Sequence, residues 1–253
     1  MNLLPNYEVN TIDTAGLYQA EKSLFGIATA EGILTPNEYL AQHTSPLADV
    51  LSGIFYLCWV PLPVFFGIWL YATGRPRPYL HFALVFLLVN LIGFALYYVH
   101  PAAPPWYIRL YGFEPQIGVP GNVAGLGAFD HITGLEVFHG LYERNANVFA
   151  AFPSLHSAYT FVAFMYAVRF KCSVWWKVIL GVVTLGIWCT AVYTFHHYII
   201  DVLGGIVCAA LGYLIFEYGL MKLDSFGCFF RRYASYISSD DTKAKHKQHS
   251  GRQ

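Results

Sequence analysis

The stretch Leu80–Val99, LHFALVFLLVNLIGFALYYV, contains no Asp, Glu, Lys or Arg. About 20 apolar residues in a helix can cross a hydrocarbon core roughly 30 Å thick, so this stretch predicts a transmembrane helix. Four other apolar windows predict further spans: Leu47–Ala72, Ser154–Val168, Val178–Phe195 and Tyr198–Phe216. We expect a kink at Pro61 and Pro63 in the first of these windows, and Ser154–Val168 is the shortest. The sequence therefore predicts an all-α, polytopic membrane helix bundle of about five transmembrane spans.

The composition of the 253-residue chain indicates the same class of protein. Hydrophobic residues make up 56% and charged residues 12%, about half the charged fraction of a soluble domain. The 20 Phe, 19 Tyr and 6 Trp exclude a disordered chain, and the net charge of zero gives no sign of nucleic-acid binding. The length leaves room for one membrane domain and for no second large one.

The N-terminal segment Ile12–Leu34 interleaves apolar residues with Glu21, Lys22 and Glu31. Because charges are costly in hydrocarbon, we expect an amphipathic helix at the membrane interface rather than a sixth span. No basic segment precedes a small-residue cleavage site, so no cleavable signal peptide is expected.

Lysine and arginine predict the orientation of the spans. If the N-terminus lies outside, 12 of the 15 Lys and Arg residues fall on the inner side, where such residues are enriched. The predicted organisation is an extracytoplasmic or interfacial segment (1–46), a transmembrane domain (47–220) with an outer loop (100–153), and a disordered cytoplasmic tail (221–253). None of the five Cys lies in the outer loop, so no extracytoplasmic disulfide framework is expected.

This orientation gathers seven ionisable side chains on the outer side: His100, His131, His139, His156, His196, His197 and Asp201. In His197-Tyr-Ile-Ile-Asp201, a spacing of four places both groups on one face of a helix. Asp201 can then accept a hydrogen bond from one ring nitrogen of His197 and leave the other nitrogen basic, as at a nucleophilic site. The alternative is a structural His–Asp pair that closes a helix end.

The segment Phe152–Ser157, FPSLHS, is typical of a helix start with Ser154 as N-cap. Free N–H groups in the first turn, together with the helix dipole, favour an anion there, and His156 could deliver a proton to it. The alternative is an ordinary capped helix with an interfacial His. Because 15 helical residues are only about 23 Å long, the start should lie below the membrane surface, which suits a lipid head group.

Two groups of motifs carry a resemblance to known families. FPSLHS, followed later in the chain by HHYIID and Gly204-Gly205, resembles the second and third motifs of the type-2 phosphatidic acid phosphatase superfamily. APPWY at Ala103–Tyr107, LYGFEP at Leu110–Pro115 and the doubled His196-His197 are similar to its inositol phosphorylceramide synthase branch. The resemblance covers about residues 97–205 and implies a type-2 phosphatidic acid phosphatase-like fold whose transmembrane domain is catalytic.

The resemblance also implies roles for individual residues. His197 matches the family nucleophile, which becomes a phosphohistidine, Asp201 the carboxylate that orients it, and His156 the acid–base group. The family requires no metal, and no cofactor is expected. The chain departs from the superfamily at Ile68, where the first motif has Lys, and at Ala191, where an Arg precedes the nucleophile. The sphingolipid synthase branch departs in the same way, which favours that branch over a simple phosphatase.

Residues expected to bind substrate or phosphate lie near these motifs: Arg109, Ser154, Ser157, His196, Trp106 and Tyr107. The basic residues expected outside are Lys22, Arg109 and Arg144, and Arg109 is favoured because it lies two residues past the PWY segment. The alternative is that the arginines extend to lipid head groups and that Trp106 and Tyr107 are interfacial anchors.

The resemblance therefore implies a metal-independent lipid phosphotransferase. It would move phosphoinositol, or a similar head group, from a membrane phospholipid donor to a ceramide acceptor through a phosphohistidine and release diacylglycerol. A lipid phosphate phosphatase that uses water as acceptor is the alternative enzyme. A proton-coupled transporter is a third hypothesis, disfavoured because the ionisable groups gather at one interface and not at the midplane.

The predicted setting follows from the same features. We expect an integral membrane protein with an extracytoplasmic active site, in a bacterial inner membrane rather than a Golgi membrane. No nucleic-acid partner is expected, and no obligate protein partner is inferred.

Overall fold

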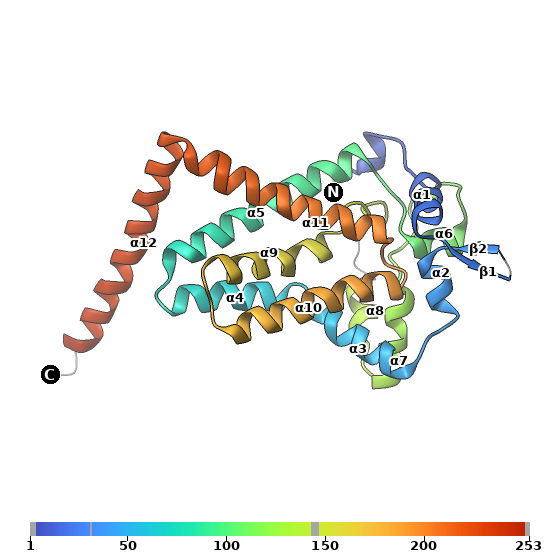
Figure 1. Cartoon of the computed structure of the whole chain (residues 1–253), viewed down its shortest axis with the longest axis horizontal. Coiled ribbons are helices and arrows are strands. Elements are labelled where there is room, and N and C mark those ends of the chain that lie inside the picture. Colours follow the sequence, from blue (N-terminus) through green and yellow to red (C-terminus); the bar gives the residue numbers. More distant parts are fainter. Residues whose placement is uncertain (1–3, 31, 143–146, 251–253) are drawn as a thin grey trace.

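Helix α9 (Leu155–Arg169) lies at the centre of a bundle of long helices (Figure 1). The structure, a computed structural model, describes residues 4–30, 32–142 and 147–250, with side chains up to residue 238. The helices that pack against α9 are α4 (Pro61–Ala72), α5 (Pro76–Val99), α10 (Val174–Tyr193) and α11 (Ile199–Leu214). On α9, Ala158, Ala163 and Ala167 are fully buried, because small side chains let neighbouring helices approach closely.

The segment that leads into the bundle consists of two helices with a bend between them. α3 (Pro46–Leu57) and α4 are separated by a short break, and their axes differ by 42°. Proline cannot donate the helical hydrogen bond and clashes with the preceding turn, so Pro61 begins a new helix. The kink predicted at Pro61 and Pro63 is confirmed.

Among the described residues, three helices are long and apolar enough to cross a membrane: Pro76–Val99, Val174–Tyr193 and Ile199–Lys222. The last of these extends α11 through a π-helical turn, η3 (Ile215–Gly219), and a 3₁₀ turn, η4 (Leu220–Lys222). The bent α3–α4 pair makes a fourth candidate. Because α9 has only 15 residues, the predicted number of five spans is approximate.

The outer faces of the long helices carry large apolar side chains that the rest of the described structure leaves exposed. Leu87, Leu91 and Phe94 on α5 and Val182 and Leu185 on α10 are each 47–58% exposed. Such a continuous apolar exterior is unfavourable in water and suits lipid. The chain is an integral membrane protein.

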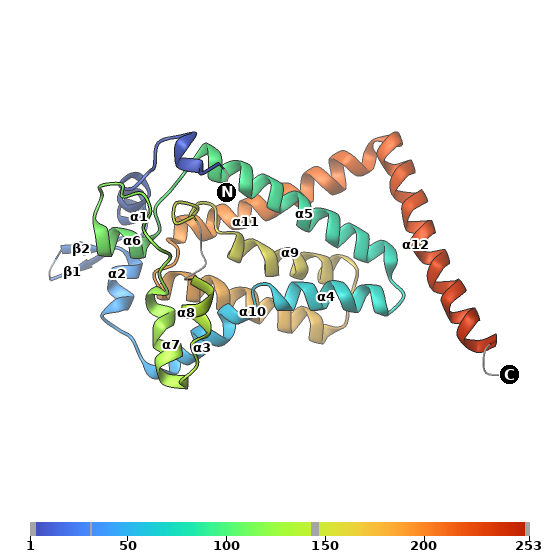
Figure 2. The same cartoon turned by 180° about the vertical axis from the view of Figure 1, so that it is seen from behind.

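Short elements cover one end of the bundle, which we call the loop end (Figures 1 and 2). They are η1 (Asn6–Glu8), α1 (Gly16–Phe25), β1 (Ile27–Thr29), β2 (Gly32–Leu34), α2 (Pro36–Ala41), α6 (Pro105–Tyr111), η2 (Ala124–Leu126), α7 (Gly127–Thr133) and α8 (Val137–Tyr142). The helix predicted over Ile12–Leu34 is shorter than expected, because it stops at Phe25 and is followed by an antiparallel hairpin. The β-branched Ile27 and Thr29 favour a strand there.

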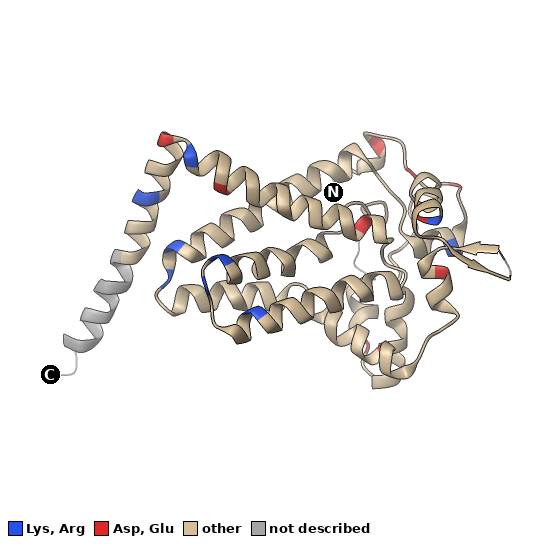
Figure 3. Cartoon of the chain, in the orientation of Figure 1, with Lys and Arg blue, Asp and Glu red and all other residues tan. Residues whose placement is uncertain are grey.

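The opposite end of the bundle carries most of the basic residues. Figure 3 shows Lys and Arg mainly at that end and most Asp and Glu at the loop end. From this end α12 (Asp224–Ser250) leaves the bundle (Figure 1). Up to residue 250 the structure therefore differs from the disordered tail expected for residues 221–253. Phe230 and Ala234 account for the difference at the start of the helix, because they are buried in the main apolar core.

Candidate active site

Three predicted catalytic side chains meet at the loop end of the bundle. His156 lies in the first turn of α9, His197 in the loop between α10 and α11, and Asp201 in the first turn of α11. The Nε2 atom of His197 is 3.2 Å from Nδ1 of His156, and its Nδ1 atom is 3.5 Å from Oδ2 of Asp201. His197 therefore lies between an imidazole and a carboxylate, with one ring nitrogen directed toward each.

The starts of α9 and α11 are held in direct backbone contact. The backbone N–H of Ser154 donates to the carbonyl oxygen of Asp201 at 2.9 Å. A Cβ atom at Gly205 would come within 2.1 Å of the Ser154 carbonyl oxygen, so only glycine permits this approach. Gly205, the second glycine after the HHYIID motif, is thus a packing requirement that lets the starts of α9 and α11 approach each other.

The loop that carries His197 folds back on the end of α10. The N–H groups of His196 and His197 both donate to the carbonyl oxygen of Ala191, at 3.1 and 2.9 Å. Ala191, where the superfamily has an arginine, is fully buried. Ile68, the other departure from the superfamily, is a 58% exposed residue of α4. Because Ala191 and Ile68 are uncharged, neither position supplies a positive charge to the site.

Burial sets the charge state of the histidines. His197 is 5% exposed, and burial lowers its pKa to about 4. The pKa of His196 is also held well below its usual value, first by burial and then by the neighbouring His197 and His156. A neutral imidazole at His197 keeps a lone pair available for attack on phosphorus.

Asp201 both caps a helix and places a carboxylate beside His197. Its side chain is fully buried, and Oδ2 accepts the N–H of Tyr198 at 2.8 Å, which caps α11. A buried carboxylate is costly unless it is paired, and Nδ1 of His197 lies near it, at a distance longer than a normal hydrogen bond. The pair can hold a proton on Nδ1 of His197, so that Nε2 faces His156 as an acceptor.

Aromatic rings surround His156. Tyr56 stacks on its imidazole at 5.0 Å between ring centroids, and Trp59 lies 4.3 Å away. The Tyr142 hydroxyl donates to the Tyr56 hydroxyl at 3.0 Å, and the Tyr142 ring contacts His196. These rings limit the access of water to the two histidines on this side.

An apolar cavity of about 620 Å³ opens beside His156. It lies between the α3–α4 break and α8, and its walls are formed by Tyr56, Leu57, Trp59, Val60, Pro61, Phe138, Leu141, Tyr142 and His156. An apolar cavity with a few polar groups at one point is typical of a site for a small amphipathic molecule.

The predicted binding residues at the start of α9 are occupied with capping. Ser154 and Ser157 are fully buried, and Ser154 Oγ accepts both the N–H and the hydroxyl of Ser157, at 3.4 and 3.1 Å. His196 contacts Thr194 through Nδ1, whereas its Nε2 has no hydrogen-bond partner among the described atoms. Of these three, His196 is the one with a free polar atom.

The other predicted binding residues pack around Phe195, which precedes the two histidines in the same loop, and not against the His156–His197 pair itself. Trp106 and Tyr107 are buried in a separate apolar cluster at the loop end, so neither is the interfacial anchor weighed above. The Arg109 guanidinium lies 4.9 Å from the Phe195 ring and lines two cavities whose walls include neither His156 nor His197. Arg144 falls outside the described residues.

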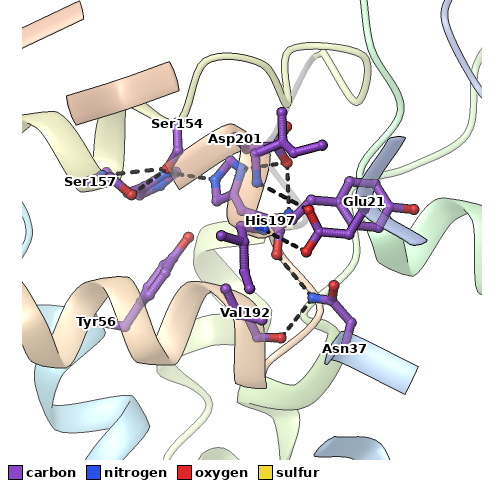
Figure 4. Close-up of polar contacts among 12 residues, drawn as sticks. Glu21, Asn37, Tyr56, Ser154, Ser157, Val192, His197 and Asp201 are labelled. Atoms are coloured by element: carbon purple, nitrogen blue, oxygen red, sulfur yellow. Dashed lines mark hydrogen bonds and ion pairs between the residues drawn. The ribbon is translucent and has the colours of Figure 1, made fainter. Parts of the chain in front are cut away.

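Two residues that the sequence did not single out as part of the site support the His197 loop. Glu21 on α1 accepts two N–H groups at the start of α11, and Asn37 on α2 donates to the carbonyl oxygens of Val192 and His197 (Figure 4). Both are fully buried. The sequence indicates only that Glu21 is a charge at the membrane interface, because no sequence pattern links it to His197, 176 residues further along the chain.

No group of three or more His, Cys, Asp or Glu that could hold a metal ion occurs in the part of the chain that the structure describes. The donor set at the site, two imidazoles and one carboxylate already paired with each other, is that of an acid–base and nucleophilic centre.

Comparison with known proteins identifies the family. The family model described as PAP2 superfamily, the type-2 phosphatidic acid phosphatases, matches residues 30–215. The phosphoinositol dihydroceramide synthase of Bacteroides thetaiotaomicron is 60% identical over 94% of this chain and 78% of its own length. The inositol phosphorylceramide synthases of Candida albicans and Saccharomyces cerevisiae (its catalytic subunit) are 30% and 32% identical over 72% of this chain.

The match to the fungal proteins covers less than half of their length, 38% and 45% respectively. No solved structure matches the chain.

Proposed function

The chain belongs to the inositol phosphorylceramide synthase-like branch of the PAP2 superfamily, and on that premise we propose that it transfers phosphoinositol, or a similar head group, to ceramide. The donor is a glycerophospholipid, and diacylglycerol is the first product. The observation that carries the proposal is the His156–His197–Asp201 constellation, in which His156 also lines an apolar cavity.

In the first half-reaction, His197 acts as the nucleophile. Its Nε2 atom forms a bond to phosphorus, while the bond between phosphorus and the glycerol oxygen breaks. His156 protonates that oxygen, and diacylglycerol leaves. Asp201, 3.5 Å from Nδ1, balances the positive charge that develops on the imidazole.

The second half-reaction reverses these roles. His156 takes the proton of the primary hydroxyl of ceramide, the hydroxyl oxygen attacks phosphorus, and the bond to His197 breaks. Two displacements retain the configuration at phosphorus and predict ping-pong kinetics.

The substrate must enter between the two histidines. The His156 and His197 nitrogens are 3.2 Å apart, which leaves a hydrogen bond between them but no room for a phosphoryl group. Attack requires about 3–3.5 Å between the nucleophile and phosphorus, so the rings must move apart when the lipid binds. Because His156 lines the apolar cavity, we infer that the lipid reaches the two histidines from the His156 side.

A lipid phosphate phosphatase remains the second candidate, because the same three side chains could activate water. The apolar cavity and the ring of Tyr56, Trp59 and Tyr142 around His156 favour a lipid acceptor. The two positions at which the superfamily carries basic residues, occupied here by Ile68 and Ala191, argue in the same direction.

We further propose that the loop end faces the extracytoplasmic side. The gathering of Lys and Arg at the opposite end supports this orientation (Figure 3). The bacterial relative supports a bacterial inner membrane as the location. No obligate protein partner is proposed, and the three side chains need no metal to complete the mechanism.

The proposal is tested with purified protein and phosphatidylinositol labelled in the inositol head group, with and without ceramide. Label in a ceramide product supports the transferase. Label released as soluble inositol phosphate at the same rate with and without ceramide would show a hydrolase instead. His197→Ala, tested in parallel, distinguishes catalysis by this site from a contaminating activity.

A further inference from the structure

The buried carboxylate of Glu21 contacts the start of α11, the helix that follows His197. Its Oε1 atom accepts the N–H of Ile199 at 2.9 Å, and its Oε2 atom accepts the N–H of Ile200 at 3.1 Å (Figure 4). Glu21 is fully buried, and α1 packs against α11. Both oxygens are thus used on consecutive N–H groups of one helix start.

Helix starts leave N–H groups without partners and carry a partial positive charge. At α11 two carboxylates satisfy them, Asp201 at Tyr198 and Glu21 at Ile199 and Ile200. Burial raises the pKa of Glu21, and the two N–H donors oppose that shift by favouring its ionised form. Charge-assisted hydrogen bonds of this kind are about twice as strong as neutral ones.

A second contact holds the other side of the same turn. Asn37 Nδ2 donates to the carbonyl oxygens of Val192 and His197, at 2.8 and 2.9 Å. Asn37 itself is placed by α2, whose start is capped reciprocally by Thr35 and Glu38. The segment that contains Glu21 and Asn37, described at residues 16–30 and 32–41, therefore contacts the end of α10, the carbonyl oxygen of His197 and the first turn of α11.

This contact pattern matters because the backbone decides where the His197 ring lies. The 3.2 Å contact with His156 and the 3.5 Å contact with Asp201 both depend on the turn at residues 197–201. A misplacement of about 1 Å at a reacting group can cost roughly 10²-fold in rate. Glu21 touches neither ring, so any effect on chemistry must pass through the backbone of α11.

We propose that Glu21 is a positioning residue for the nucleophile: its carboxylate fixes the first turn of α11 and thereby holds His197 in line with His156. This inference rests on the proposed function, because it assigns the N-terminal segment a part in the same phosphoryl transfer. Glu21 sets the rate of chemistry at a correctly folded site.

The test is a pre-steady-state burst of diacylglycerol from phosphatidylinositol in the absence of ceramide. The burst amplitude counts the sites that can form the phosphohistidine, and the burst rate reports attack by His197 at each of those sites. Glu21→Gln retains the size of the side chain but replaces one accepting oxygen with an NH₂ group that faces a backbone N–H. Glu8→Gln, an exposed glutamate of the same N-terminal region, is the matched control.

For Glu21→Gln we expect an unchanged amplitude per folded protein, a burst rate lower by about 10- to 100-fold and a KM for phosphatidylinositol within about threefold of wild type. Glu8→Gln should match wild type in both amplitude and rate. A wild-type burst rate in Glu21→Gln, or a smaller amplitude at an unchanged rate, would show that Glu21 only stabilises the fold and would overturn the inference.

A second variant covers the case in which Glu21→Gln does not fold. Glu21→Asp retains the charge but is one methylene shorter, so it cannot reach both N–H groups equally. A reduced burst rate in Glu21→Asp supports the inference, and a wild-type rate overturns it. Absence of any burst in the wild-type protein would instead contradict the proposed phosphohistidine mechanism, so the two failures are distinguishable.

Discussion

Asp201→Asn separates the charge of Asp201 from its capping role. The amide oxygen of Asn can still accept the Tyr198 N–H that Asp201 accepts at 2.8 Å, so the start of α11 should be preserved. What the variant loses is the negative charge 3.5 Å from Nδ1 of His197. That charge counts most when phosphorylation makes the imidazole cationic, so turnover should fall far more than stability.

The expected loss follows from Coulomb's law. Two unit charges 3.5 Å apart interact by roughly 5 kcal/mol at an effective dielectric constant of about 20. Since about 1.4 kcal/mol corresponds to a factor of ten, complete loss of this term lowers the rate by roughly 10³- to 10⁴-fold. A loss of about 10⁴-fold is known for the corresponding change in a Ser–His–Asp triad.

The assay is transfer of labelled head group to ceramide, with thermal unfolding in detergent as the measure of fold. Asp49→Asn is the matched control, because Asp49 lies in α3, where it accepts the Tyr193 hydroxyl at 2.7 Å and touches none of the three catalytic side chains. The control should retain turnover within a few fold of wild type. Turnover of folded Asp201→Asn within tenfold of wild type would refute the electrostatic role of Asp201.

Three other results are expected. EDTA should not change turnover, since the three side chains act without a metal; loss of turnover that Mg²⁺ or Mn²⁺ restores would overturn this. Arg109→Ala should leave turnover within about tenfold of wild type, because the guanidinium lies over Phe195 and lines cavities whose walls include neither His156 nor His197; a loss of roughly 10²-fold, the size expected for a transition-state donor, would instead assign phosphate binding to Arg109. Because the pKa of His197 is lowered to about 4 in the folded protein, the unfolded chain binds more protons between about pH 4 and 6.5, so the contribution of His197 to the free energy of unfolding should fall by about 3 kcal/mol on acidification through that window. Thermal unfolding in detergent as a function of pH measures this loss of stability. If the His197→Asn protein showed the same pH dependence as wild type, the loss could not be assigned to His197.

The parts of the fold that depend on local pattern could be predicted from the sequence. A charge-free run such as Leu80–Val99 has few alternatives to a membrane helix, and Pro61 forces a break wherever it stands in such a run. The His197–Asp201 spacing likewise predicted that the two side chains lie close together, although His197 lies in the loop before α11 and not on the helix itself. The structure brings His156 to this pair, as the family resemblance implied.

Contacts between distant segments could not be predicted in this way. Glu21 is an ordinary amphipathic-helix residue in the sequence, and only the fold shows that it is buried against Ile199 and Ile200. The hairpin at residues 27–34 was missed because two three-residue strands are too short to show alternation. Arg109 was favoured for its nearness to the PWY segment, but its guanidinium lies over Phe195 and not at the histidine pair.

In the proposed mechanism, phosphoinositol passes through His197. The most direct measurement is mass spectrometry, under conditions that preserve phosphohistidine, of purified protein incubated with phosphatidylinositol alone and then supplied with ceramide. We predict an adduct of phosphoinositol mass on His197 that forms without ceramide and disappears, with matching formation of the ceramide product, when ceramide is added. Active protein that carries no adduct, or an adduct that persists in His197→Ala, would contradict the account.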